Sequence, residues 1–385
     1  MFSVISSGMV AVMTQNIGAG RPGVAYQARQ LGLTFNAVLG IIVSLILTFG
    51  AGAILAGVGV ADALMQPART YLQIVGGFCI LNALIPICSS YLRAFGFSKE
   101  PLYASIIGNV INFCLNAFFL FVLHKGVAGV ATATVISRII NLVIVVLLGA
   151  VLVKAKQHPE RESNRAVMGQ IIRIGLPSAC ETAIYNVSMT LVIRFLNQMD
   201  AQGLNVTARS YTMQITNFSY CVGAALAQAN AIMTGWHIGA KEYDACDRGT
   251  KKAAVIGVIV AVILETVFTL CSGWIMQLFS KDPQMVSLVG KLLAIDIVLE
   301  IGRVTNLVYG QALKTSGDAV FPVVMGVCFM ILCSVGGTYL FGIRLGLLAV
   351  GAYIGMAGDE CVRAIGMYLR WKSGKWKEKG LIKSR

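Results

Sequence analysis

The chain has 385 residues, of which 57% are hydrophobic and only 12% are charged. Soluble domains carry roughly twice that charged fraction, and a soluble fold cannot bury apolar stretches that recur along a whole sequence. The net charge of +14 does not indicate nucleic-acid binding, because the basic residues sit in short loops between the apolar runs. Composition therefore excludes a soluble protein and predicts a chain embedded in the lipid bilayer, with no nucleic-acid partner.

Hydropathy predicts eleven spans in chain order, since a bilayer-crossing helix needs about 20 mostly apolar residues. The predicted spans are 1–16, 31–57, 69–92, 101–123, 127–153, 172–199, 206–235, 252–279, 285–312, 319–341 and 346–370. The first is shorter than a full crossing. The ten cysteines lie mostly inside these apolar segments without metal-ligand spacing, as small buried residues do. The expected fold class is an all-α polytopic membrane protein.

Basic residues are divided unequally between alternate loops. One set of loops, together with the tail from Arg370, holds twenty-one Lys and Arg residues, whereas the opposite set holds four. Because Lys and Arg are enriched in cytoplasmic loops, the first set and the C-terminus are predicted to be cytoplasmic. The predicted location is the plasma membrane, crossed several times.

The sequence repeats itself at an offset of about 221 residues. The matching positions are Ile17-Gly18-Ala19 with Ile238-Gly239-Ala240, Leu92, Gly96 and Pro101 with Leu313, Gly317 and Pro322, and Gly126 and Val130 with Gly346 and Val350 after one deletion. An offset of six helices preserves chain direction. The repeat therefore predicts two parallel six-helix halves, related by an axis along the membrane normal.

The repeat also predicts the domain boundaries. We expect an N-terminal lobe at 1–153 holding helices 2–6, a cytoplasmic linker at 154–171, and a C-terminal lobe at 172–385 holding helices 7–12 and a basic tail. The helix at 172–199 opens the second half, and its counterpart would precede Met1. We therefore expect the first helix of repeat one to be absent, through a truncated gene model, a fragment or a short form.

Four segments carry a family resemblance: Gln15-Asn16-Ile17-Gly18-Ala19-Gly20, Gly235-Trp236-His237-Ile238-Gly239-Ala240, Gly108-Asn109-Val110-Ile111-Asn112 and Arg370-Trp371-Lys372-Ser373-Gly374-Lys375-Trp376. In order and spacing the chain resembles the multidrug and toxic compound extrusion (MATE) family. The resemblance implies two six-helix lobes around a V-shaped cleft. It implies export of organic cations or other amphipathic compounds in exchange for Na⁺ or H⁺. The expected protein is a monomeric transporter, not an enzyme, with a small-molecule substrate and no cofactor beyond the coupling ion.

The chain departs from the family pattern in three places. We expect the family's opening helix, which commonly carries a functional acid, to be missing. Glu181 lies four residues after Pro177, whereas many members place their acid further along the helix. The segment Gly310–Asp318 resembles a weakened form of the family's Leu-Arg-Gly turn.

Ionisable groups at membrane depth are candidates for function, because burying them there is costly. The acidic ones all lie in the second half: Glu181, Glu265, Asp296, Glu300, Asp359 and Glu360. The first half has acids only in loops, at Asp62 and Glu100. Cation coupling is therefore expected in the C-terminal lobe or in the missing helix.

Asp296, Glu300 and Arg303 share one helix face at i, i+4 and i+7 spacing, with Asn306 three residues further on. A Glu300–Arg303 pair would neutralise itself and join helices. Asp296 is then left without a local partner, which makes it the better candidate for binding a cation or proton.

Glu181, Tyr185 and Ser188 form a second stripe, with Asn186 alongside. Carboxylate, hydroxyl and amide oxygens suit Na⁺, the one metal ion expected here, while a carboxyl group in an apolar site can instead take a proton. Alternatively, these polar side chains form hydrogen bonds to neighbouring helices and bind no ion. We expect Glu181 and Asp296 to approach one another and to share the coupling ion.

The remaining candidates are less specific. Glu265 has no charged neighbour one turn away, which indicates a tertiary partner or a protonated state, and Asp359–Arg363 is interpreted as a structural pair. The polar residues Asn109, Asn112, Asn116, Gln214 and Asn217 either line a cleft or join helices.

Three alternatives remain beside an antiporter. A lipid-linked saccharide flippase of the same superfamily should carry a strongly cationic cleft for pyrophosphate, whereas the charges here are mixed in sign. An intramembrane enzyme lacks support, because all three histidines lie in or beside loops and no metal or Ser/His/Asp motif is present. An inactive fragment is the third.

The loop bias is tested by labelling. A reporter fused after Lys379 should be cytoplasmic, and a cysteine placed at Asp282 should react with a membrane-impermeant reagent added outside intact cells. Reaction at position 282 only after the membrane is opened would reverse the assigned orientation.

Overall fold

The computed structural model describes residues 3–153, 160–200 and 203–382, and within these ranges it contains helices and no β-strand. The chain divides into two compact units, Met1–Gly175 and Leu176–Arg385. The all-α fold class predicted from hydropathy is confirmed.

Unit 1 is built from seven helices and the first turns of an eighth, within the described residues. They are α1 (Ser3–Gly18), α2 (Pro22–Phe49), α3 (Ala51–Val58), α4 (Asp62–Gly77), α5 (Ile80–Ala94), α6 (Lys99–Ala117), a π-helical turn at Phe118–Val122, α7 (Gly126–Leu152) and the start of α8 (Asn164–Met199). Helices α4 and α5 are bent by 41° relative to one another. At that break the Ser44 hydroxyl accepts a hydrogen bond from the Ile80 backbone N–H at 3.1 Å.

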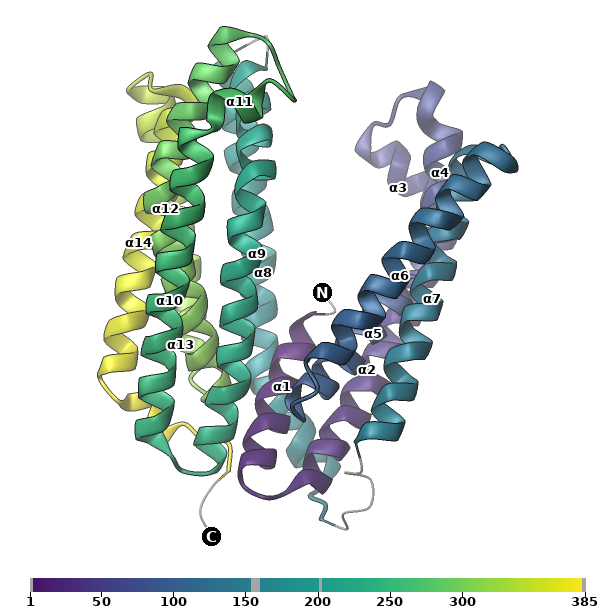
Figure 1. Ribbon diagram of the computed structural model, residues 1–385, viewed down its shortest axis with the longest axis vertical. Helices are drawn as coiled ribbons and strands as arrows, with labels where there is room; N and C mark the ends of the chain where they lie inside the picture. The colour runs from purple at the N-terminus through teal and green to yellow at the C-terminus, as the bar shows by residue number, and fades with distance from the viewer. Residues whose placement is uncertain (1–2, 154–159, 201–202, 383–385) are drawn as a thin grey trace. The chain divides into compact units, whose positions relative to one another are not determined.

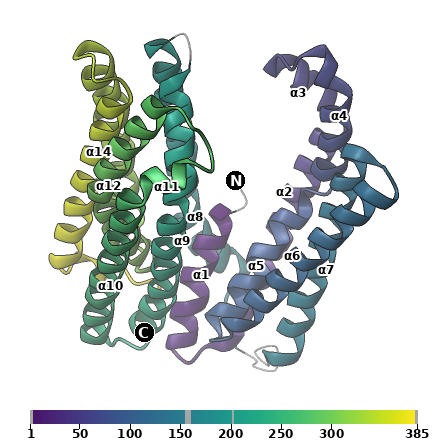
Figure 2. The ribbon, with the colours of Figure 1, turned by 45° about the horizontal axis from the view of Figure 1, so that its top comes forward.

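Unit 2 contains the rest of α8 and the remaining helices. These are α9 (Leu204–Gly239), α10 (Tyr243–Leu270), α11 (Ser272–Met276), α12 (Pro283–Thr315), α13 (Val320–Phe329), π-helical segments at Met330–Val335 and Thr338–Arg344, α14 (Leu348–Lys372) and a 3₁₀ turn at Lys375–Glu378. Helix α12 packs against α9, α10 and α14, and these helices lie side by side in both views (Figures 1 and 2). It is thus the central helix of this unit.

The helix boundaries confirm the internal repeat. Helix α2 spans Pro22–Phe49 and α10 spans Tyr243–Leu270, so both ends are displaced by 221 residues. The same offset relates the ends of α5 and α12, and the starts of α6 and α13. Gly96 and Gly317 both have positive φ, at +91° and +96°, and therefore occupy matching turns, as predicted. The axis relating the two halves stays a prediction.

The predicted linker at 154–171 is shorter than expected. Residues 154–159 lie outside the described ranges, and α8 already begins at Asn164. The physical reason is a set of contacts with α2. The Gln27 side-chain amide donates to the Glu162 carbonyl at 2.7 Å and to Asn164 Oδ1 at 2.5 Å, and Arg21 pairs with Glu162 at 2.5 Å.

Each of the eleven predicted spans falls on a helical segment, but their composition differs. Among the described residues, five helices are long and apolar enough to cross a bilayer, and the bent pair α4–α5 makes a sixth. Large apolar side chains such as Ile42, Leu45 and Phe113 are exposed on these helices, as a lipid-facing surface requires. Helices α8, α9, α12 and α14 do not belong to this apolar set. Three of them carry candidate acids, whereas Glu265 lies on α10, which does belong to it.

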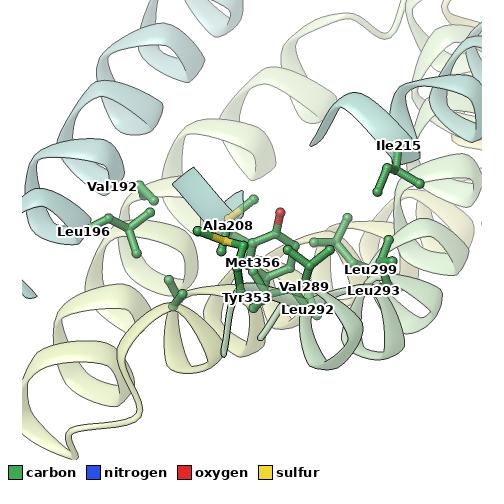
Figure 3. Packing of buried hydrophobic residues seen from close by; sticks show 14 of the residues in the cluster. Val192, Leu196, Ala208, Ile215, Val289, Leu292, Leu293, Leu299, Tyr353 and Met356 are labelled. Atoms are coloured by element: carbon green, nitrogen blue, oxygen red, sulfur yellow. The ribbon is translucent and has the colours of Figure 1, made fainter. Parts of the chain in front are cut away.

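The core of unit 2 lies where α8, α12 and α14 meet. Figure 3 shows Val289 and Leu292 of α12 packed with Tyr353 of α14, and Leu196 of α8 belongs to the same cluster. All four side chains are buried. This apolar layer fixes α12 against α14, the two helices that carry most of the candidate site.

The C-terminal segment folds back onto unit 2. The Trp376 ring stacks on Trp371 with centroids 4.1 Å apart, and its N–H donates to the Trp371 carbonyl at 2.9 Å. Arg370 binds the Asp318 carboxylate at 2.7 Å, beside the Gly317 turn. A Cβ at Gly317 would lie 2.3 Å from the Lys379 carbonyl oxygen, so only glycine admits the segment there.

Two Gly→Ala substitutions distinguish the stability cost of backbone strain from the cost of displacing the C-terminal segment. Gly96→Ala and Gly317→Ala both place a side chain at positive φ, which costs about 1–3 kcal/mol. Nothing lies within 4 Å of a Cβ at Gly96, whereas Gly317→Ala must also displace Lys379. We expect the larger fall in melting temperature in detergent for Gly317→Ala. Equal falls would show that the C-terminal segment does not contribute to stability.

Candidate functional site

A network of ion pairs joins α12 to α14 inside unit 2. The Arg303 guanidinium donates to the Glu300 carboxylate on the same helix and lies 3.8 Å from Glu360 on α14. Arg363 is 2.9 Å from Glu360 and binds both oxygens of Asp359, at 2.9 and 3.0 Å. The predicted Glu300–Arg303 and Asp359–Arg363 pairs are therefore present, and Glu360 links them through space.

Close approach of the two helices makes this network possible. A Cβ at Gly302 would lie 2.7 Å from the Cys361 backbone nitrogen, so α12 and α14 come together where a glycine leaves room. Neutral side chains complete the network. Asn306 donates to Glu360 at 2.9 Å, and the Ser334 hydroxyl donates to Asp359 at 2.9 Å. Each guanidinium and most carboxylate oxygens thereby gain the partners that burial demands.

Two carboxyl groups beside this network are buried without such partners. Glu265 on α10 has no exposed surface, and within the described part of the chain neither of its oxygens accepts a hydrogen bond. The Ser219 hydroxyl lies next to it but does not meet hydrogen-bond geometry. Asp296 is 2% exposed, and its Oδ2 also lacks a partner among the described residues. An isolated buried carboxylate is costly, so these groups are poised to take a cation or a proton.

The cluster as a whole is acidic. The Glu265 carboxyl group is close enough to interact electrostatically with Asp296 and Glu300. Asp296 in turn interacts electrostatically with Arg303 and Glu360. Counting Asp359, five carboxyl groups compare with three guanidinium groups, those of Arg303, Arg363 and the buried Arg209, which lines a cavity together with Asp296. Full ionisation would leave an excess of negative charge in a low-dielectric environment, where charge interactions are strong.

Glu181 forms an ion pair of its own, with a lysine of α12. Its carboxylate pairs with the Lys314 ammonium at 2.6 Å, and the two side chains are 18% and 13% exposed. No hydrogen bond or ion pair joins Glu181 to Asp296 within the described residues, and the sharing of one ion between them stays a prediction. Helical spacing around Glu181 does not indicate this basic partner, because Lys314 is 133 residues away in sequence.

Two cavities in unit 2 contain these separate acids. One, of about 240 Å³, is lined by Glu181, Lys314, Glu360 and Arg363 among others. The second, of about 220 Å³, is lined by Asp296, Asn217, Arg209 and Tyr353. Arg303, Tyr185 and Tyr220 line both. Arg303 therefore lies at the border between the Glu181 cavity and the Asp296 cavity.

The other predicted polar residues take different places. Tyr185 and Asn306 line the Glu181 cavity, but Asn186 is exposed and its amide donates to the Thr182 carbonyl of its own helix. Gln214 is exposed, and Asn109 is exposed on unit 1.

Asn112 joins two helices of unit 1, and Asn116 bonds to it within the same helix. The Asn112 amide donates to the Ser137 hydroxyl of α7 at 3.3 Å, and the Asn116 amide donates to Asn112 at 3.1 Å. Of the two alternatives for this stripe, helix joining is the one these contacts support.

Some residues that line these cavities are not indicated by the sequence, and Lys314, Tyr220 and Arg209 are the polar ones that matter most here. Lys314 belongs to the basic residues of the loop count, yet it lies in the last turn of α12 and lines a cavity. Tyr220 and Arg209 on α9 were not assigned, because aromatic and basic residues at helical spacing carry no local signal of a cavity. The repeat offered one clue, since Lys314 matches Arg93 at the 221-residue offset.

The chain is similar to known proteins over most of its length. The MatE family model matches residues 1–118 and 177–340. The chain is 33% identical to the "uncharacterized transporter YisQ" of Bacillus subtilis, over 99% of this chain and 85% of that protein. It is 22% identical to the "probable multidrug resistance protein YoeA" of the same organism, over 91% and 77%.

Solved structures agree with the sequence relatives. A structure described as the outward-facing conformation of a multidrug resistance MATE family transporter of the MOP superfamily matches with a TM-score of 0.87 at 18% identity, covering 100% of this chain and 85% of that one. The MATE transporter ClbM in complex with Rb⁺ matches with a TM-score of 0.83 at 17% identity, covering 98% and 85%. These likenesses concern the fold.

The fold and its buried charged cluster define a polytopic helical membrane transporter built from repeated halves. The extent of the family match shows that the chain belongs to the MatE family of multidrug and toxic compound extrusion transporters.

The central place of Glu360 gives a stability test. Glu360→Gln removes the carboxylate that Arg303 and Arg363 share, and breaking a buried pair on one side costs about 3–5 kcal/mol. The matched control is Glu162→Gln, whose pair with Arg21 is 30% and 32% exposed and is worth at most about 1 kcal/mol. We expect a clear fall in detergent melting temperature for Glu360→Gln alone. Similar melting temperatures for both variants would mean that the network is not stabilising.

Proposed function

We propose that the protein is a secondary antiporter that exports amphipathic or cationic small molecules in exchange for a proton or Na⁺ bound at the carboxyl groups of unit 2. The observation that carries this proposal is the pair of buried acids, Glu265 and Asp296: both oxygens of Glu265 and Oδ2 of Asp296 lack a partner among the described residues. The multidrug description of YoeA supports the substrate class, and the Rb⁺ complex of ClbM supports a monovalent cation.

Exchange follows from the charge excess. Five carboxyl groups beside three guanidinium groups, with Arg209 counted, favour the uptake of positive charge. A coupling ion and a cationic substrate would neutralise the same excess, so the binding of one weakens the binding of the other. That negative coupling, together with alternating access to the two sides of the membrane, is sufficient for antiport.

A proton is the coupling ion that the geometry supports better. Na⁺ needs several oxygen ligands at once. A proton needs a single carboxyl group, and it relieves the cost of burying Glu265 where no partner is present.

We also propose the oligomeric state, the membrane and the orientation in which the protein acts. The transporter would act as a monomer in the plasma membrane with its C-terminus in the cytoplasm, in keeping with the loop bias. Transport without covalent chemistry makes it a non-enzyme. An acidic cluster is poorly suited to a pyrophosphate group, so a saccharide flippase is the weaker candidate.

Efflux measurements test the coupling. Asp296→Asn and Glu265→Gln remove the titratable groups with nearly the same volume, so we expect each to reduce pH-gradient-driven ethidium efflux from vesicles at least about tenfold. Glu242→Gln, on an exposed loop position, is the matched control and should retain efflux.

The same assay under an imposed Na⁺ gradient at equal pH separates the two ions. Efflux that follows the Na⁺ gradient alone would replace the proton by Na⁺. Undiminished efflux in both acid variants would place coupling outside these carboxyl groups.

A further inference from the structure

We infer that Lys314 is a built-in counter-ion that occupies a binding position for an organic ammonium group at Glu181, and that a cationic substrate enters by displacing it. The inference rests on the proposed export of cations. It assigns recognition of the substrate cation to Glu181, apart from the coupling acids Glu265 and Asp296.

The Glu181 carboxylate is held in place from the side opposite Lys314. A Cβ at Gly326 of α13 would lie 3.2 Å from Glu181 Oε1 and 3.4 Å from its Cγ, so the α13 backbone packs directly against this side chain. Its other oxygen, Oε2, receives the Lys314 ammonium at 2.6 Å. The carboxylate is thus a fixed anionic point on the wall of a cavity of about 240 Å³.

Lys314 is the replaceable partner in this cavity. The other lining acid, Glu360, is bound by Arg303, Arg363 and Asn306 together, so a ligand would have to break three contacts to reach it. Among the described residues Glu181 forms a single ion pair, with Lys314, while Arg363 in the same cavity acts on it only electrostatically. An ammonium on a flexible four-carbon stem makes a point contact, unlike the planar, bidentate guanidinium fork, and it is exchanged more easily.

The remaining walls suit the organic part of such a cation. Tyr185, Leu307, Met330 and Met367 line the cavity. Tyr220 lines it as well, with the Arg303 guanidinium 5.9 Å from its ring centroid, and Arg363 lies on the same wall as Glu360. Aromatic faces attract cations, and methionine adapts to ligands of different shape. A carboxylate with aromatic and apolar walls recognises an alkyl- or aryl-ammonium compound. The lysine side chain, itself a butylammonium group, already occupies that position.

A purely structural Glu181–Lys314 pair makes a different prediction for ligand binding. If the pair only fastens α8 to α12, removing the ammonium weakens the protein and leaves affinity for cations unchanged. If Lys314 is a competitor, removing it leaves a partly buried carboxylate without a partner, and a free cation then binds more tightly. Coupling between close charge pairs corresponds to at least about a tenfold change in affinity.

The experiment is calorimetric titration of the purified full chain in detergent with tetraethylammonium chloride. We expect Lys314→Met, which keeps the volume, to raise affinity at least about tenfold over the unsubstituted protein. The gain should vanish in the double variant Lys314→Met/Glu181→Gln. Lys291→Met, at an exposed position of the same helix, should leave affinity unchanged. Lys314→Arg should lower affinity, because its fork holds Glu181 more firmly.

Two results would overturn the inference: an unchanged affinity in Lys314→Met, or a gain that persists without Glu181. Should Lys314→Met not purify as a single species, Lys314→Arg decides alone, since an affinity equal to that of the unsubstituted protein would contradict a competing lysine. Gradient-driven efflux measured in parallel keeps the two proposals apart. Failure of the titration with intact coupling at Asp296 removes only the role of Lys314.

Discussion

The constraint on which the rest of unit 2 depends is the burial of more carboxyl than guanidinium groups between helices at membrane depth. Burial removes an unpaired charge from bulk water, so each buried ionised group is stabilised by a partner in the protein, a proton or a bound cation. Glu300, Asp359 and Glu360 find theirs in Arg303 and Arg363, and the glycine at position 302 brings α12 close enough to α14 for this to happen. Glu265 and Asp296 find none within the described residues. The paired acids hold the helices together, and the unpaired ones create the demand for an ion.

This chemistry occurs in only one copy of the repeat. At the 221-residue offset, Ser44 takes the place of Glu265, Val75 that of Asp296, and Cys79 that of Glu300. The backbone differs at the same point, because the helix of unit 1 breaks between α4 and α5, whereas α12 runs without interruption from Pro283 to Thr315. Ser44 binds the freed Ile80 N–H at that break. Duplicated helices have thus kept their boundaries while diverging in the side chains that would bind charge.

Two acidic positions with different counter-charges suggest two tasks within unit 2. Glu181 has a lysine partner in a cavity with aromatic and methionine walls, which suits competition with an organic cation. Asp296 and Glu265 have no such partner and suit a proton. Arg303 lies at the border of the two cavities and pairs with Glu300 and Glu360, so a change in charge on either side alters the potential that the other experiences. A linkage of this kind is what an exchanger needs.

Much of this protein was determined by sequence alone. Hydropathy identified the helical segments, and collinear glycines identified the repeat, because both depend on local composition or on backbone conformations such as the positive φ at Gly96 and Gly317. The Glu300–Arg303 and Asp359–Arg363 pairs followed from helical spacing for the same reason. Tertiary structure decided the rest. The Glu181–Lys314 pair spans 133 residues, Glu360 joins two helices through space, and Asn112 bonds to a neighbouring helix rather than lining a cavity. None of these follows from periodicity, because periodicity says which face of a helix a residue occupies but not which other helix packs against that face.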